Sequence, residues 1–437
     1  MLKKITFFIA IMWYGVAARA QTALTLGDVL TQGVAASKQL RADKAKIEAA
    51  IAKYEQVRAN LYPQVKLNAG YTRLSDVPAF KVQFPGAKEA VTLFPVILDS
   101  WQGRASVQQA IFTGFRAKYA EQSAKLLQQA TVIDAEKDVD DVKLNLIATF
   151  LNLYKIAETN RLLAANEKQA TQRLTEVKNM VKQGTLLPND ELRANLQLEQ
   201  VKQAVLELRN NETIASYNLG LMLDKDFSSG VTADTSSLFD AKMVGDLNTY
   251  LAQSITSRQE VKASELRLRV SENAVKSTKG AYLPTISVGG NFYYGNPNPR
   301  YIPNTAEFKS TWDAGVNVSW DIANMFTNKN NVHEADAVFI ANKIGIEQLQ
   351  DAIKMDVNQA FMNYQTALGK INLFKLNIAQ ATENLRVTNN RFQQNTILLS
   401  DVLDADALLL QSKINYATAK ADAELAYYKL MKASAKL

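Results

Sequence analysis

The sequence has few of the residues on which catalysis, metal binding and turns depend. Its 437 residues include no cysteine, one histidine (His333), 18 glycines and 9 prolines. Without cysteine there is neither a disulfide nor a thiol nucleophile, and a single histidine excludes most transition-metal sites. Because glycine and proline interrupt helices, their scarcity favours long helices. We therefore expect no metal and no cofactor.

The first twenty residues have the three parts of a secretory signal peptide. Lys3 and Lys4 are basic, residues 5–14 are apolar, and Ala18-Arg19-Ala20 is a small-x-small cleavage site. The apolar run is too short for a membrane span, so we favour a signal peptide (1–20) over an N-terminal anchor. No cysteine follows that would carry a lipid. The net charge of +7 is mild and no basic-aromatic patch accompanies it, so we expect no nucleic-acid partner.

The sequence contains an internal duplication. The segment that begins at Trp101 aligns with the segment that begins at Trp312, and the correspondence continues for many residues. A repeat of this length is a duplicated half-molecule, because solenoid units have about 20–50 residues. We expect two structural repeats, 21–223 and 247–437, joined by a linker at 224–246 that is rich in glycine, serine and aspartate.

Each repeat contains two segments of about ten residues in which apolar and polar residues alternate. This length, with aromatic residues near the ends, is typical of transmembrane β-strands. A half-buried sheet in a soluble protein gives the same alternation, but the unequal loops of the two hairpins favour a membrane barrel. We predict strands near 64–73, 100–110, 285–295 and 311–320. The predicted lipid-facing residues are Val65, Leu67, Tyr71, Trp101, Val107, Ile286, Val288, Phe292, Trp312, Val316, Val318 and Trp320.

Four strands cannot close a barrel by themselves, because the smallest membrane barrels have about eight. An open edge in lipid leaves unpaired backbone groups, each of which costs several kcal/mol. Several copies must therefore share one barrel, with eight strands from two copies or twelve from three. The polar face includes Lys66, Arg104 and Asp313, which require water and space, and this favours the wider barrel.

The rest of the chain has the periodicity of helices. The segment 116–183 contains no glycine or proline and repeats apolar residues at i, i+3, i+4 and i+7. At 1.5 Å per residue it would be roughly 100 Å long. The second repeat contains an equivalent segment. Helices are predicted at about 26–60, 116–183, 189–223, 247–279, 327–394 and 400–435.

This order of features resembles the TolC-like outer membrane factors of Gram-negative efflux and type I secretion. The most specific likeness is at Asn395 to Ala405, which is similar to the family's second periplasmic tip, and residues 183–190 are similar to the first. The resemblance implies a mostly α-helical homotrimer in the outer membrane, with four β-strands per chain in a shared 12-stranded barrel. It implies that the long helical hairpins form a periplasmic α-barrel.

The resemblance also implies partners that dock at the tips. These are a periplasmic adaptor (membrane fusion) protein and an inner-membrane transporter of the RND, ABC or MFS type. Turn signals such as Gly184 and Pro188 agree with a hairpin end here. An apolar end becomes a partner site when it is too apolar for water, and ordinary packing over the last helical turn is the alternative. The expected docking residues are Gly184, Thr185, Leu186, Leu187, Asn395, Thr396, Ile397 and Leu398.

By the same resemblance, a periplasmic gate is expected at the tips. Asp401 and Asp404 lie three residues apart on one helix face, and Asp190 lies on the first tip. Acids are also favoured in the first turn of any helix, which is the simpler explanation of Asp190 and Asp401. The family's polar lock uses a tyrosine and an arginine, and here Phe392 and Ile397 stand at those positions. Neither donates a hydrogen bond, so closure would depend on apolar packing.

The predicted function is a passive exit duct rather than an enzyme. His333 lies beside Glu334 with no nucleophile motif and no phosphate loop. A periplasmic coiled-coil scaffold without a pore is the alternative, and such a protein could be extracted from cells without detergent. Drug, metal and protein export all fit, because a mixed polar tunnel selects weakly and specificity would lie in the pump.

Overall fold

The computed structural model describes residues 22–75, 78–92, 96–225, 231–234, 242 and 244–437. The predicted signal peptide and most of the predicted linker lie outside these ranges. Within them, no helix is both long enough and apolar enough to cross a bilayer. The chain forms two compact units, and each takes segments from both halves of the sequence. Unit 1 comprises residues up to 40, 138–254 and 354–437, and unit 2 comprises 41–137 and 255–353.

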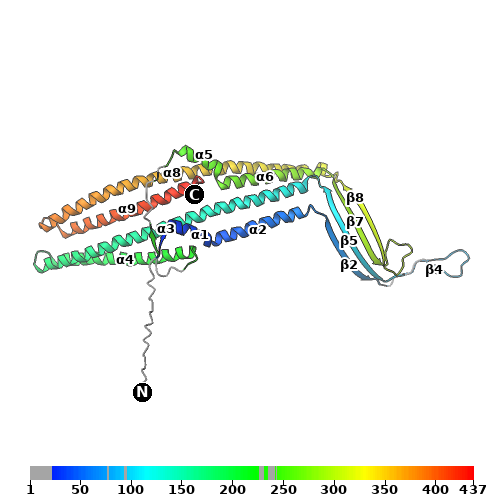
Figure 1. Cartoon of the computed structure of the whole chain (residues 1–437), viewed down its shortest axis with the longest axis horizontal. Helices are drawn as coiled ribbons and strands as arrows, with labels where there is room; N and C mark the ends of the chain where they lie inside the picture. Colours follow the sequence, from blue (N-terminus) through cyan, green and yellow to red (C-terminus); the bar gives the residue numbers. More distant parts are fainter. Residues whose placement is uncertain (1–21, 76–77, 93–95, 226–230, 235–241, 243) are drawn as a thin grey trace, which may run out of the picture. The chain divides into compact units, whose positions relative to one another are not determined.

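Unit 1 is built from two long helical hairpins (Figure 1). The first joins α3 (Arg116–Lys182) to α4 (Pro188–Met222), and the second joins α8 (Lys329–Gln393) to α9 (Leu399–Ala433). The early parts of α3 and α8 belong to unit 2. Unit 1 also contains α1 (Leu26–Ala36), α5 (Leu247–Ser257) and a parallel pair of strands, β1 (Thr22–Thr25) with β6 (Val231–Asp234). The sequence did not predict β1 and β6, because alternation over four residues is too short to recognise.

The main core of unit 1 lies where α1 packs against the middle of α3. Phe150, Leu146 and Val29 are fully buried there, together with Leu219 of α4. The predicted linker is tied to the same unit through Lys242. Its Nζ lies 2.7 Å from Oε1 of the buried Glu424 and also sits over the rings of two tyrosines of α9. This ion pair anchors the described part of the linker.

Unit 2 contains the sheet that the alternation predicted. Its strands are β2 (Gln64–Arg73), β5 (Asp99–Phe112), β7 (Thr285–Asn296) and β8 (Lys309–Ser319). They lie in the order β2-β5-β7-β8, with every neighbouring pair antiparallel, so β5 and β7 join the two repeats (Figure 1). Within the described residues, β2 and β8 each have one edge without a strand partner.

The remaining elements of unit 2 are short or lead into the sheet. They are most of α2 (Lys38–Ala59), β3 (Lys81–Val82), β4 (Val91–Thr92), α6 (Gln259–Lys279), the 3-10 turn η1 (Gly280–Tyr282) and α7 (Asn324–Thr327). Strands β3 and β4 pair within the first long loop of the sheet. The sequence predicted that loop but not its hairpin.

Three predicted helices are each interrupted at one residue. The segment 26–60 divides at Ser37, the segment 247–279 divides at Arg258, and the segment 327–394 divides at Asn328. Ser37 and Arg258 leave the helical conformation, with ψ of 119° and 134°. The Ser37 hydroxyl accepts from the Leu40 N–H at 3.3 Å, so it caps a new helix. None of the three residues is glycine or proline, the residues that usually mark a helix break in a sequence. The helical periodicity therefore did not reveal the breaks.

Candidate functional site

The two hairpin ends of unit 1 repeat one another in backbone geometry. Gly184 and Asn395 both adopt the left-handed conformation, with φ of 72° and 55°. The N–H that follows each of them, on Thr185 and Thr396, reaches back to a carbonyl in the last turn of the preceding helix, at 2.9 and 3.0 Å. This is a common way to end a helix, and glycine or asparagine is favoured at its left-handed position.

The next helix of each hairpin begins in the same way. The Leu187 N–H donates to Asp190 Oδ2 at 3.1 Å, and the Leu398 N–H donates to Asp401 Oδ2 at 3.1 Å. In both cases an acid at the third helical position satisfies a backbone donor that the helix leaves free. Asp190 and Asp401 therefore have a structural role at the start of their helices, as the simpler interpretation of the sequence expects.

Asp404 differs from these two acids. Its side chain is exposed, one turn beyond Asp401 on α9. Among the described residues it takes part in no hydrogen bond or ion pair. Helix capping therefore does not explain Asp404, which is the acid of this group that is free to act on something outside the chain.

The apolar residues of both ends share one core. Phe392, only 6% exposed, packs with Leu399 and Val402 of its own hairpin and with residues of the first hairpin. Leu186 and Ile397 are partly buried against this cluster. Leu187 and Leu398 remain 70% and 69% exposed. The first-hairpin members of the cluster are Leu174, Val177, Ala194 and Leu198.

The predicted tip residues thus fall into two groups. Phe392, Leu186 and Ile397 hold the two hairpins together within the chain. The others face outward and are available to a partner. The exposed docking candidates are Gly184, Thr185, Leu187, Asn395, Thr396 and Leu398.

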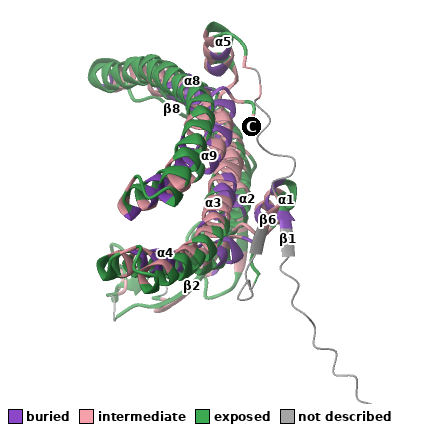
Figure 2. Cartoon of the chain, turned by 90° about the vertical axis from the view of Figure 1, so that its left-hand side faces the viewer, coloured by how far each residue is buried: buried purple, intermediate pink, exposed green. Residues whose placement is uncertain are grey.

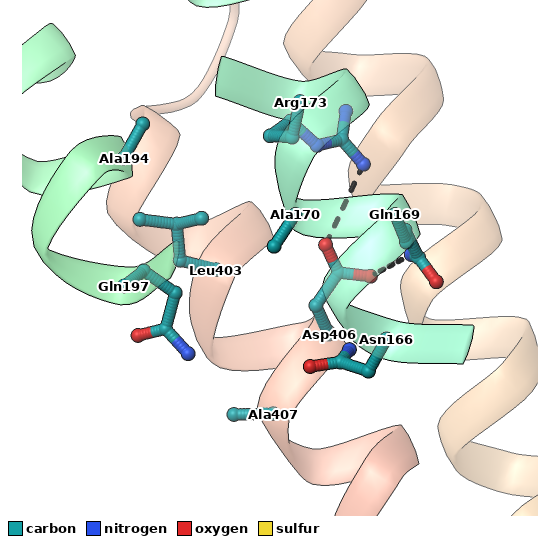
Figure 3. A pocket seen from close by; sticks show the side chains of 9 residues that line it. All are labelled: Asn166, Gln169, Ala170, Arg173, Ala194, Gln197, Leu403, Asp406 and Ala407. Carbon is teal, nitrogen blue, oxygen red and sulfur yellow. Dashed lines mark hydrogen bonds and ion pairs between the residues drawn. The ribbon is translucent and has the colours of Figure 1, made fainter. Parts of the chain in front are cut away.

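A polar cluster that the sequence did not indicate lies between the hairpins, near these ends. Figure 3 shows Asp406 of α9 between Gln169 and Arg173 of α3. Gln169 Nε2 donates to Asp406 Oδ1 at 2.6 Å, and Arg173 Nη2 lies 3.5 Å from Asp406 Oδ2. Arg173 Nη2 also donates to Asn389 Oδ1 at 2.9 Å. The cluster borders a cavity of about 20 Å³, room for about one water.

Burial governs the chemistry of this cluster. It raises the pKa of Asp406 above its usual value, although Arg173 and Gln169 act in the opposite direction. Arg173 Nε is buried and has no hydrogen-bond partner among the residues that the structure describes. The signal that would have revealed the cluster is a charged residue on a packing face, since Asp406 lies four residues after the buried Val402 and three before the buried Leu409. Such residues are seldom buried without a partner.

The sheet of unit 2 presents its apolar residues outward. Leu67 and Trp312 are 82% and 76% exposed, and they lie in one row across the four strands. Of the twelve predicted lipid-facing residues, Ile286 and Val288 are half-buried and the other ten are exposed. Tyr71 and Trp101 pack against each other near one end, with ring centroids 4.4 Å apart and the rings tilted by 38°. An apolar face of this extent requires a cover other than water.

Comparison with known proteins agrees with these features. A family model described as outer membrane efflux protein matches residues 29–223 and 250–436. Outer membrane protein TolC of Vibrio cholerae is 19% identical over 428 residues, covering 96% of this chain and 92% of that protein. TolC of Escherichia coli K12 is 21% identical over 440 residues, covering 96% and 84%. The solved structure of CusC has the same fold, with a TM-score of 0.80 at 15% identity, covering 95% and 92%.

Proposed function

The chain belongs to the outer membrane efflux protein family, and on that premise we propose that it is the passive exit duct of a tripartite efflux or type I secretion system. The protein lies in the outer membrane, with its helical part in the periplasm. In this proposal it performs no catalysis and uses no cofactor. Substrates would pass from an inner-membrane transporter and a periplasmic adaptor into the duct.

The free edges of the sheet carry this proposal. Because every neighbouring pair in the order β2-β5-β7-β8 is antiparallel, β2 and β8 run in opposite directions. Strand β8 of one copy can therefore pair antiparallel with β2 of the next, and repetition about an axis closes a ring. Three copies would form a barrel of twelve strands, with its apolar face toward lipid and its polar face toward water.

The helices of unit 1 support the same assembly. The exposed apolar side chains of α4 lie on one side of that helix, given 3.6 residues per turn, and those of the later part of α8 lie on one side of α8. Figure 2 shows the extensive exposed surface of both helices. Stripes of this kind suit packing against a second copy of the chain. Their members are Leu192, Leu196, Leu206, Ile214, Tyr217 and Leu221 on α4, and Met355, Met362, Leu373, Leu376 and Val387 on α8.

The hairpin ends supply the periplasmic part of the proposal. The adaptor would dock on the exposed residues of the two turns, centred on Leu187 and Leu398. Asp404, with Asp401 beside it, would line the narrowest point of the entrance in the resting trimer. Phe392 and Ile397 would contribute to closure through the packing that holds the two hairpins together.

The test is the assembly state and conductance of the purified protein. Light scattering of the detergent-solubilised protein should give three times the mass of one chain, and planar bilayers should show discrete conductance steps. A folded, monodisperse monomer would exclude the shared barrel. Extraction from cells without detergent, with no conductance, would favour the scaffold instead.

A further inference from the structure

The polar face of the sheet is ordered in rows that cross all four strands. One row consists of Lys66, Ser106, Asn291 and Asp313, and the adjacent row consists of Asn68, Arg104, Tyr293 and Thr311. On the other side of the first row, Gly289 and Gly315 occupy two of the four positions and have no side chains. A hollow of about 320 Å³ lies over these glycines, with Arg104 and Asp313 in its lining.

Two arginines meet at one tyrosine beside this hollow. The guanidinium carbons of Arg104 and Arg300 lie 5.4 and 4.1 Å from the centroid of the Tyr293 ring. Arginine is favoured over an aromatic face because the ring's negative face attracts the cation. Arg104 comes from β5, Tyr293 from β7, and Arg300 from the loop between β7 and β8. Three separate segments thus converge on one point.

Hydrogen bonds fix the two arginines in place. Arg104 donates to Asn291 Oδ1 through Nε at 3.1 Å and Nη2 at 2.7 Å. Asn291 Nδ2 donates to Asp313 Oδ1 at 2.7 Å, and Arg300 Nη2 donates to Asp313 Oδ2 at 2.5 Å. Asp313 therefore bonds directly to Arg300 and is linked to Arg104 through Asn291. Within the described residues, Nη1 of each arginine has no protein acceptor.

The charges of this face do not cancel. Lys309 is matched by Glu307, with Nζ and Oε2 2.7 Å apart. Lys66, Arg104 and Arg300 then stand against Asp313 alone, a surplus of two positive charges in each chain. The surplus would be repeated in every copy around a shared barrel. Charges of one sign that line a narrow pore with low-dielectric walls act together on a passing ion.

We propose that Arg104 and Arg300, held on Tyr293, form an oxyanion-binding collar in the outer-membrane part of the pore. The collar binds carboxylate or phosphate groups of passing solutes through the unused Nη1 donors, since guanidinium groups match the geometry of these anions. This inference rests on the channel function proposed above, and it deepens that function by naming an anionic substrate class. The pore would then be lined by aspartates at its periplasmic entrance and by arginines at its outer-membrane end.

The test is block of the channel by inorganic tripolyphosphate in planar bilayers. Added on the side of the strand loops, tripolyphosphate should reduce the current of the wild-type channel. The double variant Arg104→Gln with Arg300→Gln should raise the half-blocking concentration at least fivefold, and Asp313→Asn should lower it. Arg300→Gln alone tests the collar with less disturbance, because Arg300 lies in a loop.

Two controls separate the possible outcomes. Arg73→Gln removes an arginine of opposite strand parity on β2 and should leave the block unchanged. Arg104→Lys with Arg300→Lys keeps the charge and should restore part of the block. If wild-type channels conduct and the Gln variants are blocked as before, the collar is only a structural network and the inference is wrong. If the wild-type protein forms no channel, the proposed function itself fails, and the collar fails with it.

Discussion

The sheet and the hairpin ends use apolar residues in opposite ways. At the hairpin ends, Phe392 and Val402 are buried inside the chain, and Asp401 and Asp404 are exposed. In the sheet, Leu67 and Trp312 lie on the surface, and the polar residues bond to one another on the other face. The hairpin ends thus bury most of their apolar side chains within the chain, whereas the outer face of the sheet is arranged for lipid, as expected of an outer membrane protein.

The largest effect should come from the shared core of the hairpin ends. Phe392→Ala would leave a cavity between the hairpins and should cost about 3–5 kcal/mol of unfolding free energy in that region. Leu398→Ala is the matched control, since its side chain is exposed, and should change stability by less than about 0.5 kcal/mol. Thermal unfolding and proteolysis near the turns would measure both. Equal effects of the two substitutions would contradict the burial difference.

In the sheet the order of sensitivity should be the opposite of that at the hairpin ends. There a substitution at an exposed apolar position should do the greater damage, because that position faces lipid. Val316→Arg should impair trimer assembly by about 2–4 kcal/mol if the residue lies near the bilayer midplane. Asn317→Arg, one residue along on the polar face, should be tolerated. Recovery of trimers from outer membranes after mild detergent extraction compares the two variants. Loss of trimers only in Asn317→Arg would mean that the faces are assigned the wrong way round.

Adaptor docking can be separated from core packing by the choice of leucine. Leu187→Asp with Leu398→Asp changes the exposed residues of the turns, so it should abolish export while trimers still reach the outer membrane. Leu186→Asp with Ile397→Asp should also lower stability, because both side chains pack on the shared core. Export assays and trimer yield would be measured together. Full export by the Leu187 and Leu398 double variant would place docking elsewhere.

Two substitutions one turn apart on α9 distinguish a role in the gate from a role in helix capping. In a trimer, Asp401 and Asp404 would form rings of like charge at the entrance, which should favour cations and allow divalent cations to block the pore from the periplasmic side. Asp404→Ala should weaken this block without loss of thermal stability, because Asp404 has no partner in the described chain. Asp401→Ala should lower stability slightly, because it removes the acceptor of the Leu398 N–H. Single-channel recording and thermal unfolding give the two readouts. Unchanged cation preference and divalent block in the double variant Asp401→Ala with Asp404→Ala would show that neither residue lines the gate.

The smallest effect concerns pH at the buried cluster. Because burial raises the pKa of Asp406 in the folded state, protonation favours folding. The free energy of unfolding of the wild type, relative to Asp406→Asn, should rise as pH falls from neutral through the raised pKa toward the ordinary value. Melting temperatures across that range would show it, with Asp404→Asn as an exposed control on the same helix. A relative loss of stability in acid would mean that Arg173 outweighs burial.

The sequence by itself determined the local elements. Alternation located β2, β5, β7 and β8 within two residues at each end, and the absence of glycine and proline marked the length of α3. The duplication also appears in the structure, where the turns after Gly184 and Asn395 have the same hydrogen bonds. These features are readable because strand and helix periods depend on residues only a few positions apart.

Only the tertiary structure decided which residues meet. It joined β5 to β7 across the two repeats, partly buried Leu186 but left Leu187 exposed, and brought Arg173 to Asp406. It also placed Arg104 and Arg300 on the same tyrosine. Such pairs are far apart along the chain, and their contacts depend on how whole elements pack. No local period records that packing, because contact across elements depends on side-chain direction and burial rather than on sequence spacing.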